Sequence, residues 1–227
     1  MTDSPPRRVR DDPARPDPAF AELYASLPDA TDLEPWLGWC RAAGGPVLYL
    51  GIGAGRLAVP LAGRGVELVG VDSHPGMLGR LHVRAPSMEL VRARIEDLVL
   101  DRPFPLVIAP SNILCTHARL AGAARHVDPG GRLGFELMNP HWLRAGAAPE
   151  VAVLAWTGAT ASIEVTYPGG AVQPAEVPLI WPEDVERFLA GAGLDLVWMG
   201  GAGDEVESSS TIHVLCAPAG ILSRDDP

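Results

Sequence analysis

The spacing of apolar residues changes along the chain and divides it into regions. Short, almost wholly apolar runs at residues 46–52, 67–72, 88–95, 104–111 and 132–138 alternate with segments of helical spacing. Strands without polar alternation are buried on both faces, as in a parallel sheet covered by helices. The pattern therefore predicts a Rossmann-like α/β fold with a mostly parallel sheet and helices on both of its faces.

Other elements are predicted on either side of this alternation. Helical spacing precedes the first strand at residues 18–27 and 32–45, and the second of these helices ends at Gly44-Gly45. After the fifth strand, apolar and polar residues alternate, which predicts a small β insertion within residues 140–180. A final helix and two strands complete a single domain of residues 18–217, at residues 182–193, 194–200 and 211–217.

The two ends of the chain differ in composition from the domain. Residues 1–17 are rich in proline and charge and contain no apolar core of a signal peptide, so we expect a segment that is disordered or loosely draped over the domain. Residues 218–227 are expected to form a C-terminal tail. No apolar run approaches the roughly 20 residues that span a bilayer, which favours a cytoplasmic protein without a membrane partner.

The stretch VLYLGIGAGR, residues 47–56, joins the first strand to a helix through three alternate glycines. Glycine allows a sharp turn and lets a ligand approach the backbone. Asp72 ends the second strand, 21 residues after Gly51, where a carboxylate can accept hydrogen bonds from both hydroxyls of a ribose. The combination predicts an adenosine-type ligand beyond the carboxyl ends of the strands.

A dinucleotide is not the ligand that this loop favours. The dinucleotide fingerprint G-x-G-x-x-G requires glycine at position 56, and Arg56 stands there. An NAD-dependent reductase is therefore a weak alternative.

Five segments, in order, resemble the class I S-adenosylmethionine-dependent methyltransferases, in particular small bacterial enzymes that act on small molecules. They are VLYLGIGAGRLAVPLA, GVDSHPGML, FPLVIAPS, DPGGRLGFELMNP and PEDVERFLAGAGLDLV, and the resemblance covers residues 20–217. It implies a seven-stranded sheet of order 3-2-1-4-5-7-6 with an antiparallel last strand. It also implies S-adenosylmethionine as cofactor and methyl transfer to an oxygen or nitrogen atom of a small molecule.

The resemblance implies cofactor contacts at the ends of the first four strands. The glycines Gly51, Gly53 and Gly55 are expected near the methionine part and ribose, and Asp72 at the ribose hydroxyls. The remaining implied contacts are Ser73 and Met77 near the adenosine, Ile95 beside the adenine, Glu96 of the IEDL segment, and Ser111 facing the methionine part.

Two positions depart from the family's pattern. Tyr49, an implied cofactor contact, stands where the family usually has an acid that holds the cofactor's ammonium end, and Arg94 stands where an acid is common near the adenine. A neutral phenol supplies no charge there. Each loss weakens cofactor binding by roughly 1–3 kcal/mol if no other group compensates. The alternative is thus a methyltransferase-like protein whose methyl transfer is weakened or lost and which binds, regulates or performs another reaction.

Histidines after the fourth and fifth strands are the candidate catalytic residues. A base is needed only when the acceptor keeps its proton, and His117 and His141 are the two imidazoles placed to act as one. His126 and His213, within a helix and a strand, are read as structural. The substrate pocket is expected to be closed by aromatic residues of the first helices and the insertion: Tyr24, Trp36, Trp156, Tyr167 and Trp181.

Composition restricts the partners further. The formal net charge of −10 disfavours nucleic acid. Cys40, Cys115 and Cys216 are far apart and form no CxxC pair, which predicts buried free thiols and no metal site. We expect a small-molecule substrate and a monomer or homodimer, the insertion being a candidate dimer edge.

Overall fold

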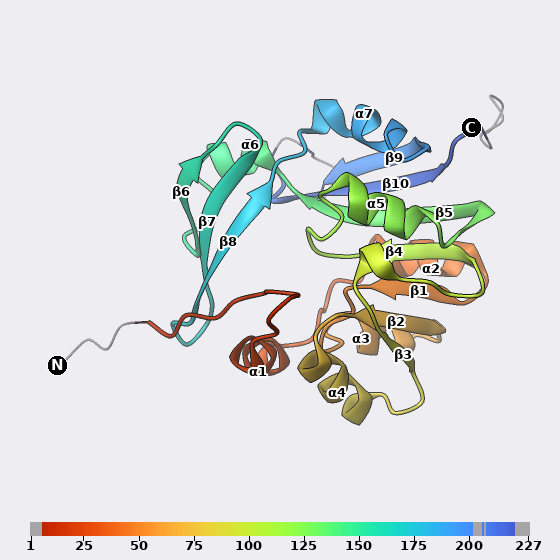
Figure 1. The fold of residues 1–227 in the computed structure, drawn as a ribbon, viewed down its shortest axis with the longest axis horizontal. Helices are drawn as coiled ribbons and strands as arrows, with labels where there is room; N and C mark the ends of the chain where they lie inside the picture. The colour runs from red at the N-terminus through yellow and green to blue at the C-terminus, as the bar shows by residue number, and fades with distance from the viewer. Residues whose placement is uncertain (1–5, 202–205, 207, 221–227) are drawn as a thin grey trace.

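The computed structural model describes residues 6–201, 206 and 208–220, and its centre is a seven-stranded sheet of order β3-β2-β1-β4-β5-β10-β9 (Figure 1). The strands are β1 (Val47–Leu50), β2 (Leu68–Asp72), β3 (Glu89–Arg92), β4 (Phe104–Ala109), β5 (Val127–Met138), β9 (Leu194–Gly201) and β10 (Thr211–Pro218). Strands β1 to β5 pair in parallel, and β10 runs antiparallel to both β5 and β9. The predicted sheet, including its order, is confirmed.

Helices cover both faces of this sheet, because the central strands carry apolar side chains on both sides. On one face, α2 (Trp36–Ala43), α3 (Ala58–Ala62) and α4 (Pro75–Arg84) enclose one core cluster. On the other, α5 (His117–Ala124) and α7 (Val185–Ala190) enclose a second. A short 3₁₀ turn, η1 (Ile95–Asp97), follows β3, and η2 (Pro182–Asp184) leads into α7.

One expected boundary differs. The fifth strand is predicted over residues 132–138, yet β5 already begins at Val127 and includes the sequence DPGG of residues 128–131. Its pairing with β4 shifts register between Phe104 and Leu106, where the glycines are accommodated as an irregularity in the ladder. The strand is therefore continuous but locally distorted.

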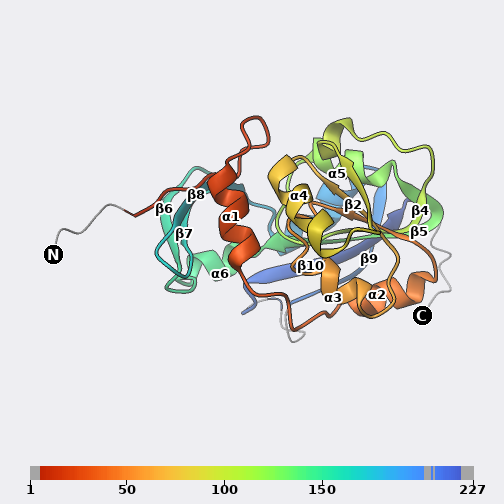
Figure 2. The ribbon, with the colours of Figure 1, turned by 90° about the horizontal axis from the view of Figure 1, so that it is seen from below.

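The predicted β insertion is a separate three-stranded antiparallel sheet, order β6-β7-β8, that stands apart from the main sheet (Figures 1 and 2). It consists of a short helix and three strands: α6 (Pro140–Arg144), β6 (Val151–Trp156), β7 (Thr160–Thr166) and β8 (Val172–Pro178). Its own small core includes Leu143, Ile163 and Leu179. Figure 2 shows α1 (Pro18–Ser26) between this sheet and α4.

The N-terminal segment of residues 6–17 is held against the insertion. The Val9 N–H donates to the Val172 carbonyl at 3.0 Å, and the Val172 N–H donates to the Arg7 carbonyl at 2.9 Å. Val9 is fully buried, and Arg8 pairs with Glu164 at 2.7 Å. The prediction of disorder is therefore wrong for residues 6–17, because the edge strand β8 offers backbone partners.

The remaining terminal predictions are tested only in part. Residues 1–5 and 221–227 lie outside the described residues, and Pro218, the first residue of the predicted tail, ends β10. The three cysteines are free and buried, as predicted. Within the described part of the chain, no helix has the length and apolar character needed to span a membrane.

Candidate functional site

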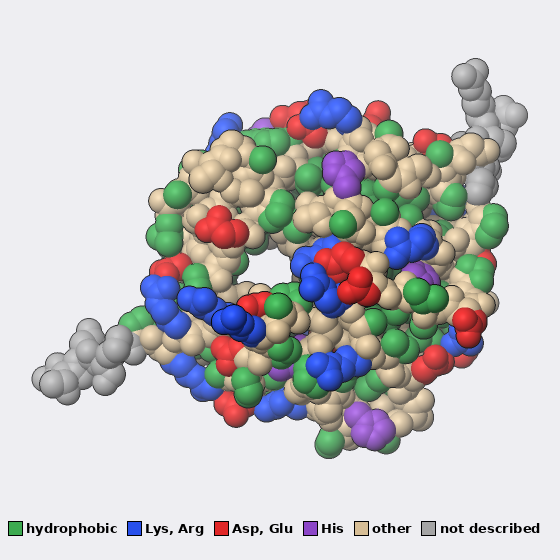
Figure 3. Space-filling view, in the orientation of Figure 1, with side chains coloured by type: hydrophobic (Ala, Val, Ile, Leu, Met, Phe, Trp, Pro, Cys, Tyr) green, Lys and Arg blue, Asp and Glu red, His purple; other side chains and the backbone are tan. Residues whose placement is uncertain are grey.

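A cavity of about 720 Å³ lies at the carboxyl ends of β1, β2, β4 and β5, facing the insertion. Figure 3 shows the molecule hollowed between the insertion and the main sheet, with arginine and acidic side chains near the edge. Its walls come from the N-terminal segment, α1, the strand-end loops and β7–β8. The volume lies in the range of ordinary ligand sites. Open sheets of this kind bind ligands at this edge.

The three glycines of the first loop do different work. All have left-handed backbone, with φ of 68° at Gly51, 57° at Gly53 and 86° at Gly55. A Cβ at Gly53 would point into open space beside the cavity, whereas one at Gly55 would lie 2.4 Å from Leu81 Cδ1. Gly51 and Gly53 line the cavity and Gly55 does not. Gly55 therefore allows α4 to pack closely against the loop. It does not line the cavity, where a cofactor contact was expected.

Asp72 fixes the loop and faces the cavity. Its Oδ2 accepts a hydrogen bond from the Gly53 N–H at 2.8 Å, and its Oδ1 accepts one from the His74 N–H at 2.8 Å. Burial raises the pKa of this carboxyl, while the two backbone N–H groups act in the opposite direction. Each carboxylate oxygen keeps a further lone pair. Two hydroxyl donors on one ligand can therefore be bound.

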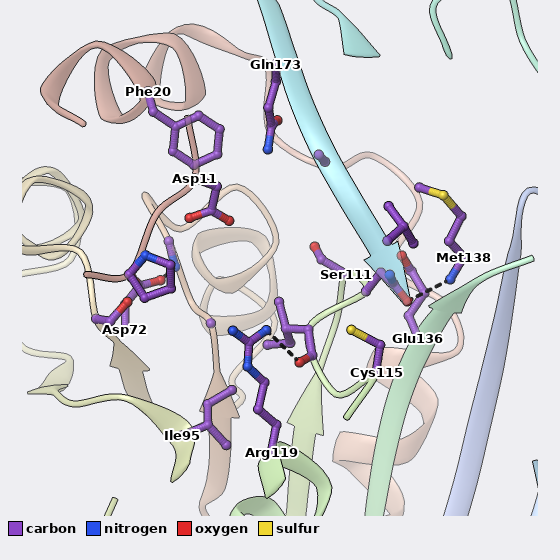
Figure 4. Close-up of a pocket in the computed structure, with 18 of the residues that line it drawn as sticks. Asp11, Phe20, Asp72, Ile95, Ser111, Cys115, Arg119, Glu136, Met138 and Gln173 are labelled. Carbon is purple, nitrogen blue, oxygen red and sulfur yellow. Dashed lines mark hydrogen bonds between the residues drawn. The ribbon is translucent and has the colours of Figure 1, made fainter. Parts of the chain in front are cut away.

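An ion cluster closes the end of the cavity near β3. Glu96 Oε1 lies 3.3 Å from Arg119 Nε and 3.4 Å from an Arg94 guanidinium nitrogen. Burial acts to raise the pKa of the Glu96 carboxyl, but its backbone hydrogen bond and Arg119 outweigh burial, so the pKa is lowered. Ile95 lines the same end, and Figure 4 shows Ile95, Arg119 and Asp72 on one side of the cavity. Arg94 is thus a partner of Glu96 at the cavity wall.

The predicted contacts Ser73, Met77 and Ser111 also line the cavity. Ser111 has φ of 74°, an uncommon conformation for a residue other than glycine. Such backbone conformations cluster at ligand sites. The structure thus brings together Gly51, Gly53, Asp72, Ser73, Met77, Ile95, Glu96 and Ser111.

Tyr49 lies beneath the cavity and is not among the residues that line it. It is 5% exposed and packs in the core between α2 and the sheet. Burial, followed by the nearby charges of Glu136 and Asp72, raises its pKa far above the ordinary value. The tyrosine is therefore a neutral core residue and supplies no charge to a ligand.

The two candidate catalytic histidines lie outside the cavity. Thr116 caps α5, and His117, the next residue, turns its ring onto Phe188, with ring centroids 4.8 Å apart. His141 lies in α6, with Nε2 3.3 Å from Glu183 Oε2. Neither imidazole lines the cavity, so the structure gives no support to either as a base.

Sequence reasoning missed several residues of the cavity wall. Asp11 reaches it from the N-terminal segment, and its pKa is raised by burial and then by the charge of Asp72. Glu136 reaches it from β5, with Oε2 3.6 Å from His213 Nε2. Glu136 carried a sequence signal, since it is the one acid in the predicted fifth strand of residues 132–138. Asp11 carried none.

Of the aromatic residues expected around a pocket, two line it. The Tyr167 hydroxyl hydrogen-bonds Gln173 Oε1 at 2.5 Å and lies 3.5 Å from the Tyr24 hydroxyl. Trp36 packs on His213 in the core. Trp156 and Trp181 stack on Arg144 away from the cavity. The aromatic wall is therefore a tyrosine pair.

Comparisons with known proteins agree with this architecture. Residues 47–131 match a family described as a methyltransferase domain. A ubiquinone biosynthesis O-methyltransferase of Azoarcus sp. (strain BH72) is 27% identical over 197 residues, which cover 82% of this chain and 79% of that protein.

Two solved structures share the fold. The CcbJ methyltransferase from Streptomyces caelestis superposes with a TM-score of 0.70 at 24% identity, covering 88% of this chain and 96% of that one. The glycopeptide N-methyltransferase MtfA, complexed with S-adenosylmethionine, superposes with a TM-score of 0.59 at 22% identity, covering 85% and 97%.

Proposed function

The chain is a class I S-adenosylmethionine-dependent methyltransferase, and on that premise we propose that it methylates an oxygen or nitrogen atom of a small molecule. The observation that carries the proposal is the joint placement of Gly53 and Asp72 at the cavity. A ligand can approach the Gly53 backbone because no atom fills the space of a Cβ. Next to it, the Asp72 carboxylate keeps acceptor capacity for a ribose diol.

The residues that line the cavity offer contacts to the ribose, the adenosine and the methionine part of S-adenosylmethionine. Asp72 would hold the ribose hydroxyls, Ile95 and Met77 would flank the adenosine, and Ser111 would face the methionine part. When bound, the cofactor supplies an electrophilic methyl group. Gly51 lines the cavity with left-handed backbone, and a Cβ there would lie 2.5 Å from Ile113 Cδ1.

The protein's contribution to methyl transfer is to position the acceptor. Transfer from a sulfonium requires an acceptor atom in line with the bond that breaks. The insertion and α1 provide walls that would hold such an acceptor against the strand-end loops. Cys115 also lines the cavity, but burial raises the pKa of its thiol, which keeps it protonated near neutral pH.

The similar proteins do not distinguish between an oxygen and a nitrogen atom as the methyl acceptor. One similar protein is named an O-methyltransferase and another an N-methyltransferase. A cavity of about 720 Å³ leaves room for a small molecule beside a nucleoside cofactor.

We propose that the protein is a monomer or a homodimer. Light scattering during gel filtration measures this oligomeric state directly.

Calorimetry tests the cofactor assignment. Titration with S-adenosylmethionine and S-adenosylhomocysteine should give saturable heats. Measurable binding of both ligands supports the proposal. If neither ligand gives heat at millimolar concentration, the proposal is overturned.

A protein that has lost methyl transfer is the second candidate, because Tyr49 is buried and neutral where the family has an acid. If the cofactor site is degenerate, Tyr49→Glu with Arg94→Asp raises cofactor affinity by decades. If other groups compensate, affinity changes little.

A further inference from the structure

Charge is distributed unevenly along the cavity. Among the residues that line it, the two cationic side chains are Arg94 and Arg119, and both bind Glu96 at the end near β3. The opposite wall, toward the insertion, carries Glu136 and Glu176, and no Arg or Lys lines that wall in the described structure. An anionic acceptor would be repelled there, whereas a cation would be attracted.

Glu136 is fixed in place rather than free in solvent. Its side chain is 22% exposed, and Oε2 lies 3.6 Å from Nε2 of His213, which is itself 9% exposed. The His213 ring packs edge-on against Trp36, with centroids 5.4 Å apart. Figure 4 shows Glu136 beside Ser111 and Met138, across the cavity from Asp72 and Ile95. The carboxylate is therefore held at the end of the cavity away from the expected adenosine contacts.

Two tyrosine rings also line the cavity. Tyr24 and Tyr167 line the cavity with ring centroids 6.0 Å apart. Tyrosine faces attract cations through the ring quadrupole, and more strongly where water is excluded. The tyrosine pair is an observation separate from Glu136 and Glu176, and it also favours a positively charged ligand.

We propose that the acceptor is an amine, and that Glu136 orients its nitrogen and stabilises the positive charge that the nitrogen gains. The inference rests on the proposed function. The amine binds as the ammonium ion that this end attracts. It reacts after losing its proton to water, because only the neutral form has a lone pair. Glu136 accepts an N–H hydrogen bond and directs that lone pair at the methyl carbon.

The reaction balances without a further reactant. The nitrogen lone pair forms the new N–C bond as the C–S bond breaks, and the C–S electron pair remains on sulfur. The products are S-adenosylhomocysteine and an N-methylammonium ion. Positive charge therefore moves from sulfur to nitrogen, and a fixed carboxylate beside the nitrogen stabilises the transition state. A phenolate or carboxylate acceptor would meet like charge instead.

Binding of three matched probes tests the proposal on the full chain saturated with S-adenosylhomocysteine. The probes are benzylamine, benzyl alcohol and benzoate, titrated at pH 7.5 by saturation-transfer NMR. The benzylammonium ion should bind about tenfold more tightly than the alcohol, as expected of a charge-assisted contact. Benzoate should bind most weakly. The variant Glu136→Gln should remove the preference for the amine.

The control is Glu150→Gln, an exposed acid of the insertion that does not line the cavity. Glu150→Gln removes one negative charge, as Glu136→Gln does, and this variant should still bind the amine more tightly than the alcohol. Thermal melts verify that both variants fold.

Three results would overturn the proposal: no amine preference in the natural chain, a preference that survives Glu136→Gln, or tighter binding of benzoate. If Glu136→Gln instead weakens S-adenosylhomocysteine tenfold and leaves the amine preference intact, Glu136 belongs to the cofactor. Failure of the proposed function looks different, because S-adenosylhomocysteine then gives no heat at all. The three probes still report the charge preference on the free protein.

Discussion

The two ends of the cavity differ in how the chain builds them. The cofactor end comes from loops that directly follow β1, β2, β3 and β4, so backbone geometry places its groups. The acceptor end combines the N-terminal segment, α1, β5 and β7–β8, which are far apart in sequence. The family match covers residues 47–131, which include little of the acceptor end. The family match therefore says more about the cofactor end than about the acceptor end.

Removal of the Asp72 charge should have the largest effect on ligand affinity, and this effect should be confined to ligands of the cofactor end. We expect Asp72→Asn to weaken S-adenosylhomocysteine binding by about 10- to 100-fold, the value of charged hydrogen bonds to a diol. Calorimetry measures it. The control is Asp97→Asn, whose side chain is 75% exposed nearby. A loss below threefold would remove Asp72 from the cofactor site.

A pair of glycine substitutions separates ligand approach from backbone strain. Gly53 and Gly65 both have left-handed φ, and neither has an atom within 4 Å of an added Cβ. Gly53→Ala and Gly65→Ala should therefore cost similar stability, roughly 1–2 kcal/mol. Gly53 lines the cavity and Gly65 does not.

Calorimetry on the glycine pair should therefore show about a tenfold loss of S-adenosylhomocysteine affinity in Gly53→Ala only, the order of an unfavourable contact of about 1.4 kcal/mol. Equal affinities in the two variants would contradict a close approach of ligand to Gly53.

Asp11 lies where the two ends meet, and its pKa predicts a pH-dependent stability. Because burial and Asp72 raise this pKa in the folded state, the carboxyl stabilises the fold at low pH. That contribution is complete below the ordinary value of 3.8 and is lost as pH rises through the raised pKa. Asp11→Asn should therefore raise the melting temperature of the ligand-free protein at pH 7 by about 2–4 °C. The gain should vanish near pH 3.

The control for Asp11 is Asp101→Asn, since Asp101 is exposed and does not line the cavity. It should shift the melting temperature little at either pH. A pH-independent gain in Asp11→Asn would argue against charge as the cause.

The smallest effects should come from the two histidines. His117→Gln and His141→Gln should change S-adenosylhomocysteine affinity and amine preference by less than about twofold, the size expected of surface substitutions. The same titrations measure this. A tenfold loss in either variant would place that imidazole in the site after all.

The sequence predicted what depends on local pattern. Apolar strands alternating with helices specified the sheet, because burial on both faces requires that pattern. The loop glycines Gly51 and Gly53 and the acid Asp72 were found because they directly follow strands whose ends meet at one edge.

Residues whose role depends on tertiary contacts were not found. The spacing that identified Gly51 and Gly53 also included Gly55, yet its neighbour is Leu81 of α4. His117 follows a strand end, but the cap at Thr116 starts a helix that turns its ring to α7. Asp11 lies in a proline-rich, charged segment whose partner is β8, and no local pattern specifies that pairing.

The bridge between Arg8 and Val172 also has a consequence for synthesis. It joins residues 164 positions apart (172 − 8). At about 5–20 residues per second, β8 leaves the ribosome roughly 8–33 s after the segment it pairs with. The glycine loop and Asp72 are by then already made, while the segment that carries Asp11 still lacks its partner. The wall of the acceptor end is therefore completed late, and a growing chain exposes its cofactor loop before it encloses a substrate.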